Sequence, residues 1–252
     1  MDVDEYIAQI VSNGHALAQA ASAAGWDAVV PPCPEWTVRD LVTHVGGVHR
    51  WAAEIVRDGL SAEQAATVGS VGVGPADPEL LDWYLSSNAL LVWQLQAAPG
   101  SLECFTFLPA PSPLAFWARR QAHETAIHRV DAESAAGSVA VFDPDFAQDG
   151  IAEMAAGFSR RRRQFDRAGT LALSSTDGPS WRAEFGADGV AVAAGEGPRG
   201  RDRDRNVVRA VPLAVEPAVR CDRGGRRRAR RAVGPSPGAL VLGSSAPWVI
   251  GA

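Results

Sequence analysis

Apolar residues recur every three to four positions along four long segments in the first half of the chain. The segments cover residues 4–24, 37–57, 78–97 and 114–136, and each has the length of a helix of about five to six turns. A proline-rich run at 31–34, a Gly/Ala-rich stretch before residue 78 and a loop at 99–113 separate them. Four helices of similar length predict a four-helix bundle, a fold that commonly builds metal sites between facing helices.

The second segment carries the clearest helix signals. Thr37 is a good N-cap, and Asp40 stands three residues later, where it can complete a capping box. Its predicted core face consists of Val38, Leu41, Val45, Val48, Ala52 and Ile55.

The pattern changes after about residue 140. A further helix is expected at about 144–166. Its four arginines at 160–163 are interpreted as a solvated helix end. A nucleic-acid contact is not favoured, because the interleaved aromatic residues typical of such contacts do not accompany these arginines. Alternating segments at 170–176, 181–185 and 190–194 predict short strands joined by Asp-Gly turns at 177–178 and 188–189, and 105–108 is a further candidate strand. The expected fold class is α+β: a bundle at 1–140, a helix and the start of a small α+β domain at 141–195, and a tail at 196–252.

The formal charge of −5 combines an acidic body with a basic tail. Residues 196–252 hold 12 of the 24 arginines but only five of the 29 acidic residues, and the chain has no lysine. Such a tail can contact nucleic acid or be disordered. Translation of a GC-rich gene in a shifted reading frame also gives a segment rich in Arg, Gly, Pro and Ala. The composition changes abruptly, at a point where the strand pattern still needs further strands, and this favours a shifted frame over a functional tail. We therefore expect an irregular tail and an incomplete small domain.

Cysteine usage and hydropathy bear on the compartment. Three scattered cysteines, with no C-x-x-C pair, argue against a disulfide framework and a thiolate zinc cluster. The acidic N-terminus does not resemble a signal peptide, and the chain has no apolar run long enough to span a membrane. These features predict a cytoplasmic protein.

The fourth predicted helix carries the residues best suited to chemistry. Glu124, His128 and Asp131 stand at i, i+4 and i+7, so they project from one face. Zinc accepts carboxylate and imidazole ligands, and two ligands at i, i+4 can share one ion. The alternative is a solvated face, on which Arg120 and Glu124 form an ordinary i, i+4 ion pair. A metal site here needs a third ligand from elsewhere in the chain.

The second predicted helix offers two histidines as that third ligand. His44 and His49 each lie about 70° from the centre of the apolar face, on opposite sides, so the pattern does not choose between them. They lie about 140° apart, so one ion is not expected to bind both. His15 and His123 point away from the relevant faces of their helices.

Two stretches resemble the actinobacterial mycothiol-dependent maleylpyruvate isomerase family. They are residues 33–47, Cys-Pro-Glu-Trp-Thr-Val-Arg-Asp-Leu-Val-Thr-His-Val-Gly-Gly, and residues 118–133, which include the Glu124–Asp131 motif. The resemblance extends over about residues 4–195. It implies a DinB-like bundle that holds a divalent metal, zinc being expected, through His44, Glu124 and His128.

The same resemblance implies a reaction. The thiolate of the cofactor mycothiol adds reversibly to the activated C=C bond of a small dicarboxylate such as maleylpyruvate, the bond rotates, and the thiol leaves to give the trans isomer. Asp131 matches an acidic position of the family motif and is expected to orient His128, while Arg120 is a candidate anchor for a substrate carboxylate. Cys33 is expected to be a small buried hydrophobe and not a nucleophile.

Two alternatives remain open at this stage. The same metal site can serve mycothiol S-transfer or hydrolysis of a conjugate, or the bundle can bind metal without catalysis. Family members usually continue into a sterol-carrier-like α+β domain that supplies an arginine to the active site. Residues 181–185 and 188–190 resemble its opening strands, but no residue after Gly195 can be assigned that arginine's role. The expected partners are a small thiol and a small carboxylate-bearing substrate, and neither a membrane nor a nucleic acid.

Overall fold

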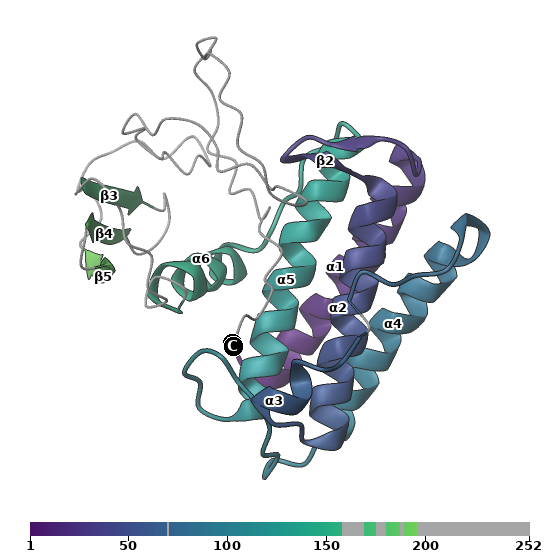
Figure 1. Cartoon of the computed structure of the whole chain (residues 1–252). Helices are drawn as coiled ribbons and strands as arrows, with labels where there is room; N and C mark the ends of the chain where they lie inside the picture. Colours follow the sequence, from purple (N-terminus) through teal and green to yellow (C-terminus); the bar gives the residue numbers. More distant parts are fainter. Residues whose placement is uncertain (70, 158–168, 175–179, 187–188, 196–252) are drawn as a thin grey trace, which may run out of the picture. The chain divides into compact units, whose positions relative to one another are not determined.

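A computed structural model describes residues 1–69, 71–157, 169–174, 180–186 and 189–195 of the chain (Figure 1). It divides into two compact units, of which the first contains Met1–Val141 and the second begins at Phe142. The predicted α+β fold class is confirmed, because long helices dominate the N-terminal part and short antiparallel strands follow later in the chain.

Within the described residues, the first unit is built on four long helices: α1 (Val3–Ala24), α2 (Val38–Asp58), α4 (Asp77–Ala97) and α5 (Pro113–Ala135). α1 packs along α5 and α2 along α4, while contacts of α1 with α4 and of α2 with α5 close the bundle (Figure 1). The largest fully buried side chains, in order of size, are Trp117, Tyr84, Ile10, Leu17, Leu41, Ile55, Leu80, Leu91, Leu95, His49, His128 and Gln121.

α2 begins with a capping box and buries its predicted apolar face. The Thr37 hydroxyl accepts a hydrogen bond from the Asp40 backbone N–H, and the Asp40 carboxylate accepts one from the Thr37 N–H at 2.9 Å, so the predicted capping box is present. All six residues of the predicted apolar face are buried. Gly59 ends the helix in the left-handed conformation, with φ of 60°.

A small hairpin leads into α2. β1 (Val29–Val30) pairs antiparallel with β2 (Cys33–Thr37) around a turn at residues 31–32. The backbone N–H groups of Val38 and Arg39 donate to the carbonyls of Ala28 and Trp26 at 2.9 and 3.1 Å, which ties the first turn of α2 to the segment just before this hairpin. The sequence indicated only that the prolines exclude a helix here.

The connections at the other end of the bundle differ from the prediction. A short helix, α3 (Ala62–Ala65), interrupts the expected loop after α2. The predicted strand at 105–108 is wrong. The Phe105 N–H donates to the Leu60 carbonyl at 2.7 Å, and the Phe105 carbonyl accepts from the Trp117 indole at 2.9 Å, so these groups serve loop and side-chain contacts instead of a ladder.

The second unit contains the small α+β part. α6 (Pro144–Ala152) passes into a single π-helical turn, η1 (Glu153–Gly157). The strands β3 (Gly169–Ser174), β4 (Ser180–Gly186) and β5 (Gly189–Gly195) form an antiparallel sheet in the order β3-β4-β5. The three predicted strands are confirmed, except that residues 175–176 of the first lie outside the described residues.

Several expectations lie outside the described residues. These are the end of the helix predicted to reach residue 166 with its arginines at 160–163, the turn at 177–178, Asp188 of the following turn, and the nature of the tail at 196–252. In the described part of the chain, every helix is too short or too polar to span a membrane.

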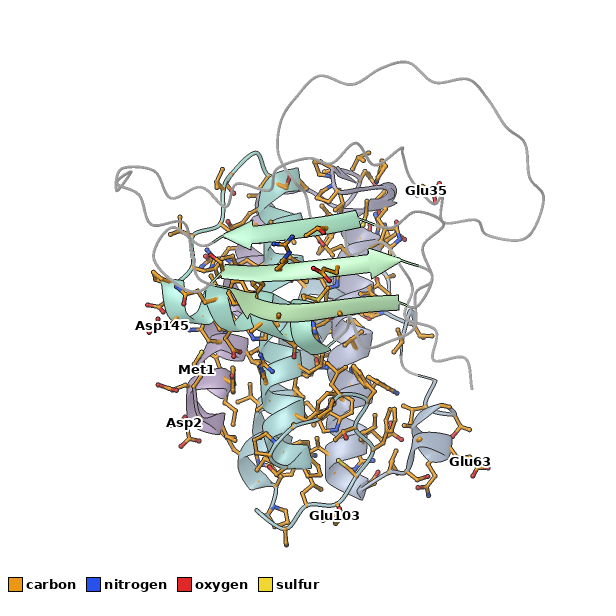
Figure 2. All side chains as sticks on the ribbon, turned by 90° about the vertical axis from the view of Figure 1, so that its left-hand side faces the viewer. Met1, Asp2, Glu35, Glu63, Glu103 and Asp145 are labelled. Atoms are coloured by element: carbon orange, nitrogen blue, oxygen red, sulfur yellow. The ribbon has the colours of Figure 1, made fainter. Side chains whose placement is uncertain are left out.

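Acidic side chains lie mostly on the outside of the first unit. Figure 2 shows Glu35, Glu63 and Glu103 at its periphery, and all three are exposed. Asp131 of α5 is different, with only 2% of its surface exposed. A buried carboxylate requires a partner, and the partners of Asp131 lead to the functional site.

Candidate metal centre

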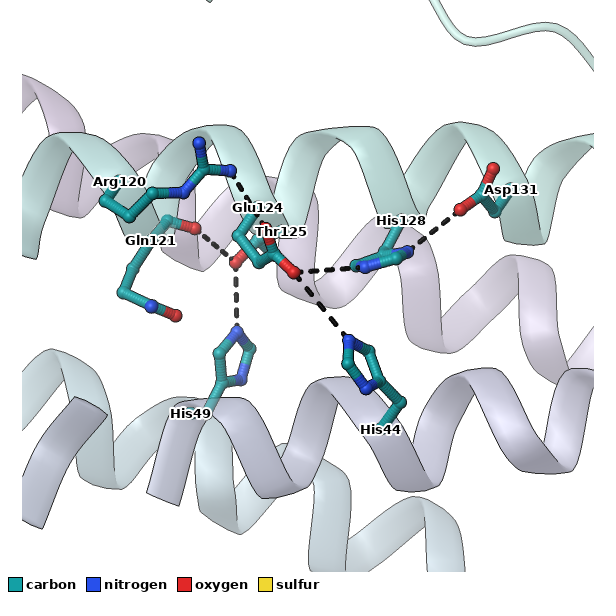
Figure 3. Close-up of polar contacts among 8 residues, drawn as sticks. All are labelled: His44, His49, Arg120, Gln121, Glu124, Thr125, His128 and Asp131. Carbon is teal, nitrogen blue, oxygen red and sulfur yellow. Dashed lines mark hydrogen bonds and ion pairs between the residues drawn. The ribbon is translucent and has the colours of Figure 1, made fainter. Parts of the chain in front are cut away.

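Three of the predicted site residues converge between α2 and α5. His44 projects from α2 toward Glu124 and His128 of α5 (Figure 3), and their ligand atoms all lie within 4.8 Å of one another. Glu124 Oε1 lies 3.2 Å from His128 Nε2 and 3.7 Å from His44 Nε2. One carboxylate oxygen therefore stands beside two imidazole nitrogens.

Asp131 holds the other side of the His128 ring. His128 Nδ1 lies 2.9 Å from Asp131 Oδ2, and both side chains are buried. Burial opposes a charge on His128, but hydrogen bonds to Asp131 and Glu124 outweigh it and raise its pKa to about 9. Because ionised carboxylates only accept, both ring nitrogens of His128 donate in this arrangement. A metal ion bound at Nε2 would replace that proton, while Asp131 kept the ring oriented.

Arg120 binds the second oxygen of Glu124. Its Nη2 donates to Glu124 Oε2 at 2.9 Å, and its side chain is 8% exposed. Burial favours the neutral form of Glu124, but contacts with His128, His44 and Arg120 hold the pKa of this carboxyl well below its usual range. The predicted Arg120–Glu124 ion pair is thus present. The alternative of a solvated helix face is wrong, because Arg120, His128 and Asp131 are all buried.

His49 makes a polar contact that is separate from the cluster. Its Nε2 lies 3.0 Å from Thr125 Oγ1, and the Thr125 hydroxyl donates to the Gln121 carbonyl at 2.7 Å. Since that bond uses the only hydroxyl hydrogen of Thr125, His49 Nε2–H is the donor to Thr125. The ring is fully buried, and desolvation lowers its pKa to about 3. His49 is therefore a neutral core histidine and not part of the cluster.

The remaining histidines also lie outside the cluster. His15 is exposed on α1, and the buried His123 packs edge-on against Tyr6 with ring centroids 6.1 Å apart. Cys33 is buried with 3% of its surface exposed, as predicted for a small core residue.

Trp36 is a neighbour of the cluster that the sequence analysis missed. Its ring centroid lies 5.0 Å from that of His44 and 6.5 Å from that of His128, and it stacks on the His128 ring with 19° between the planes. Trp36 comes from β2, directly before the N-cap of α2. Its place next to the N-cap of α2 puts Trp36 near the start of the helix that carries His44. The sequence does not indicate that its ring also contacts His128 of α5.

The donor atoms fit a divalent metal ion. Two imidazole nitrogens and one carboxylate oxygen are ligands that zinc and similar first-row metals accept. Three protein ligands also leave a coordination position for an exogenous group, as in catalytic zinc sites. The metal would bind Nε2 of His44 and Nε2 of His128, which both face Glu124 Oε1. Nδ1 of His128 is already bonded to Asp131.

The fold and the cluster together define a four-helix bundle with a His–Glu–His candidate metal centre between two of its helices. The family model of the mycothiol maleylpyruvate isomerase N-terminal domain matches residues 7–133, just over half of the chain. The chain belongs to this family, which confirms the resemblance found in the sequence. No curated protein and no solved structure matches it.

Proposed function

We propose that this protein is a zinc-dependent, mycothiol-using enzyme of the maleylpyruvate isomerase type. In this function it catalyses cis-trans isomerisation through reversible addition of the mycothiol thiolate to a small unsaturated dicarboxylate. The observation that carries the proposal is the gathering of His44, Glu124 and His128 within 4.8 Å, in a chain of this family.

Each residue of the cluster has a distinct role in the proposal. His44, Glu124 and His128 hold the metal, and Asp131 keeps His128 in the orientation that presents Nε2. When bound, the metal supplies a coordination position at which a thiol loses its proton near neutral pH. His44 and Glu124 retain side-chain exposures of 19% and 14%, whereas His128 and Asp131 retain 2% and 4%. The exogenous thiol therefore has access from the side of His44 and Glu124.

The test is turnover of maleylpyruvate by the zinc-loaded full chain with mycothiol, followed by its ultraviolet absorbance. His44→Ala should lose bound zinc and isomerase activity, because the cluster then keeps only two ligands. His49→Gln is the matched control on the same helix and should retain both, since His49 contacts Thr125 and not the cluster. Equal loss of zinc in the two variants would contradict the assignment.

Mycothiol S-transfer or conjugate hydrolysis is a second candidate for the same site. The observation in its favour is that the family match covers residues 7–133, an N-terminal domain that does not itself specify the reaction. Zinc-dependent consumption of a mycothiol conjugate without turnover of maleylpyruvate would identify this activity. Tight zinc binding with neither reaction would indicate a non-catalytic metal-binding bundle.

A further inference from the structure

Arg120 is a buried cation that reaches the candidate metal centre through another residue. Its guanidinium binds Glu124 Oε2, while Glu124 Oε1 faces both histidines (Figure 3). The carboxylate is thus held at one oxygen and presents the other one to the position between the imidazoles. This arrangement favours binding of a metal by a single oxygen of Glu124.

A second Arg–Glu pair on the same helix provides a comparison. Arg129 Nε donates to Glu133 Oε1 at 2.6 Å with the same i, i+4 spacing, and Arg129 Nη1 donates to Asn13 Oδ1 of α1 at 3.1 Å. That pair joins two helices and contacts none of the three cluster residues through these bonds. The two pairs share their chemistry but differ in their relation to the site.

The formal charges around the cluster suggest what Arg120 contributes. Glu124 and Asp131 are negative, Arg120 is positive, and the histidines are neutral when they act as ligands. These side chains together carry one negative charge, so a divalent ion leaves the centre with one positive charge. A bound monoanion such as a thiolate then makes the centre neutral. Without Arg120, the same anion would leave a negative charge in a mostly buried site, which is unfavourable.

We propose that Arg120 is a positioning residue that makes this centre selective for an anionic exogenous ligand, by holding Glu124 and by compensating the charge of a bound thiolate. The inference rests on the proposed metal site. It assigns Arg120 a role through Glu124 in place of the direct contact with a substrate carboxylate that the sequence analysis suggested.

Cobalt(II) is the probe metal, because its visible spectrum reports a change of ligand. The full chain loaded with cobalt is titrated with thiocyanate, a monoanion, and separately with imidazole, which is neutral. Arg120→Gln keeps an amide that can donate to Glu124 but removes the charge, whereas Arg120→Lys keeps the charge. Arg129→Gln is the matched control on α5.

Arg120→Gln should weaken thiocyanate binding about tenfold or more and change imidazole binding by less than about twofold. Arg120→Lys should retain most of the thiocyanate affinity, and Arg129→Gln should retain both affinities. Equal weakening of both ligands in Arg120→Gln would show a purely structural role and overturn the inference, as would unchanged thiocyanate binding. If Arg120→Gln does not fold, loss of anion preference in folded Arg120→Lys would overturn it.

The outcome separates this inference from the proposed function. A wild-type chain that binds no cobalt or zinc would overturn the metal site and the role of Arg120 with it. A wild-type chain that binds cobalt, with the same ligand preference in all variants, would overturn the role of Arg120 alone.

Discussion

Replacing His49 with glutamine removes a buried imidazole and keeps an amide that can donate to Thr125. In the folded protein, desolvation lowers the pKa of His49 from 6.5 to about 3, so the neutral ring is strongly favoured. The unfolded chain takes up a proton below pH 6.5, and the folded chain does so only near pH 3. The stability linked to His49 is therefore complete above pH 6.5 and is lost as the pH falls toward 3.

The size of this effect follows from the two pKa values. Between pH 7 and pH 4.5, preferential protonation of the unfolded chain at His49 should cost about 2.5 kcal/mol of unfolding free energy. The assay is urea unfolding of the wild type and His49→Gln at both pH values, with a chelator present. Other titrating groups are common to both chains, so the difference between their pH-dependent losses isolates His49. Losses that agree within about 0.5 kcal/mol would refute the argument that burial keeps this ring neutral.

Three further predictions concern the metal centre. Asp131→Asn should weaken zinc binding about 10–100-fold in a chelator competition, because the neutral amide holds His128 less firmly; unchanged affinity would contradict its orienting role. The raised pKa of His128, about 9, means that zinc displaces a proton at neutral pH, so the apparent zinc affinity should rise about tenfold per pH unit between pH 6 and 8. A flat profile would argue against His128 as a ligand. Cys33→Ala should leave mycothiol affinity, measured by calorimetry on the zinc-loaded chain, within about twofold, since the Cys33 side chain is buried; loss of binding with the fold intact would implicate Cys33 instead.

The bundle was predictable because its signals are local. The apolar period of the second segment, together with Thr37 and Asp40, determined both the start of α2 and its buried face. The spacing of Glu124, His128 and Asp131 likewise required only a helix. What the sequence could not supply was the hairpin before α2, whose strands of two and five residues are too short to give an alternating pattern.

The choice between His44 and His49 shows a second limit. A helical wheel gives the angle of each side chain around its own axis, but not its height along the neighbouring helix. Five residues separate the two histidines, which is about 7.5 Å along α2. Their partners on α5 are nevertheless adjacent in sequence: His44 lies beside Glu124, and His49 lies beside Thr125. The pattern of α2 alone does not show which residues of α5 each histidine meets. Resemblance to the family selected His44 because it supplies this long-range information.

Two adjacent residues of α5 thus give the two histidines of α2 different chemistry. Thr125 accepts a hydrogen bond from His49, which satisfies one ring nitrogen, and complete burial keeps the imidazole neutral. Glu124 instead brings a carboxylate charge beside His44, and Arg120 compensates part of that charge from the other oxygen. Because ligand access requires some exposure, the partly exposed His44–Glu124 side is suited to bind an exogenous group, and the buried His49–Thr125 contact is suited only to stabilise the core.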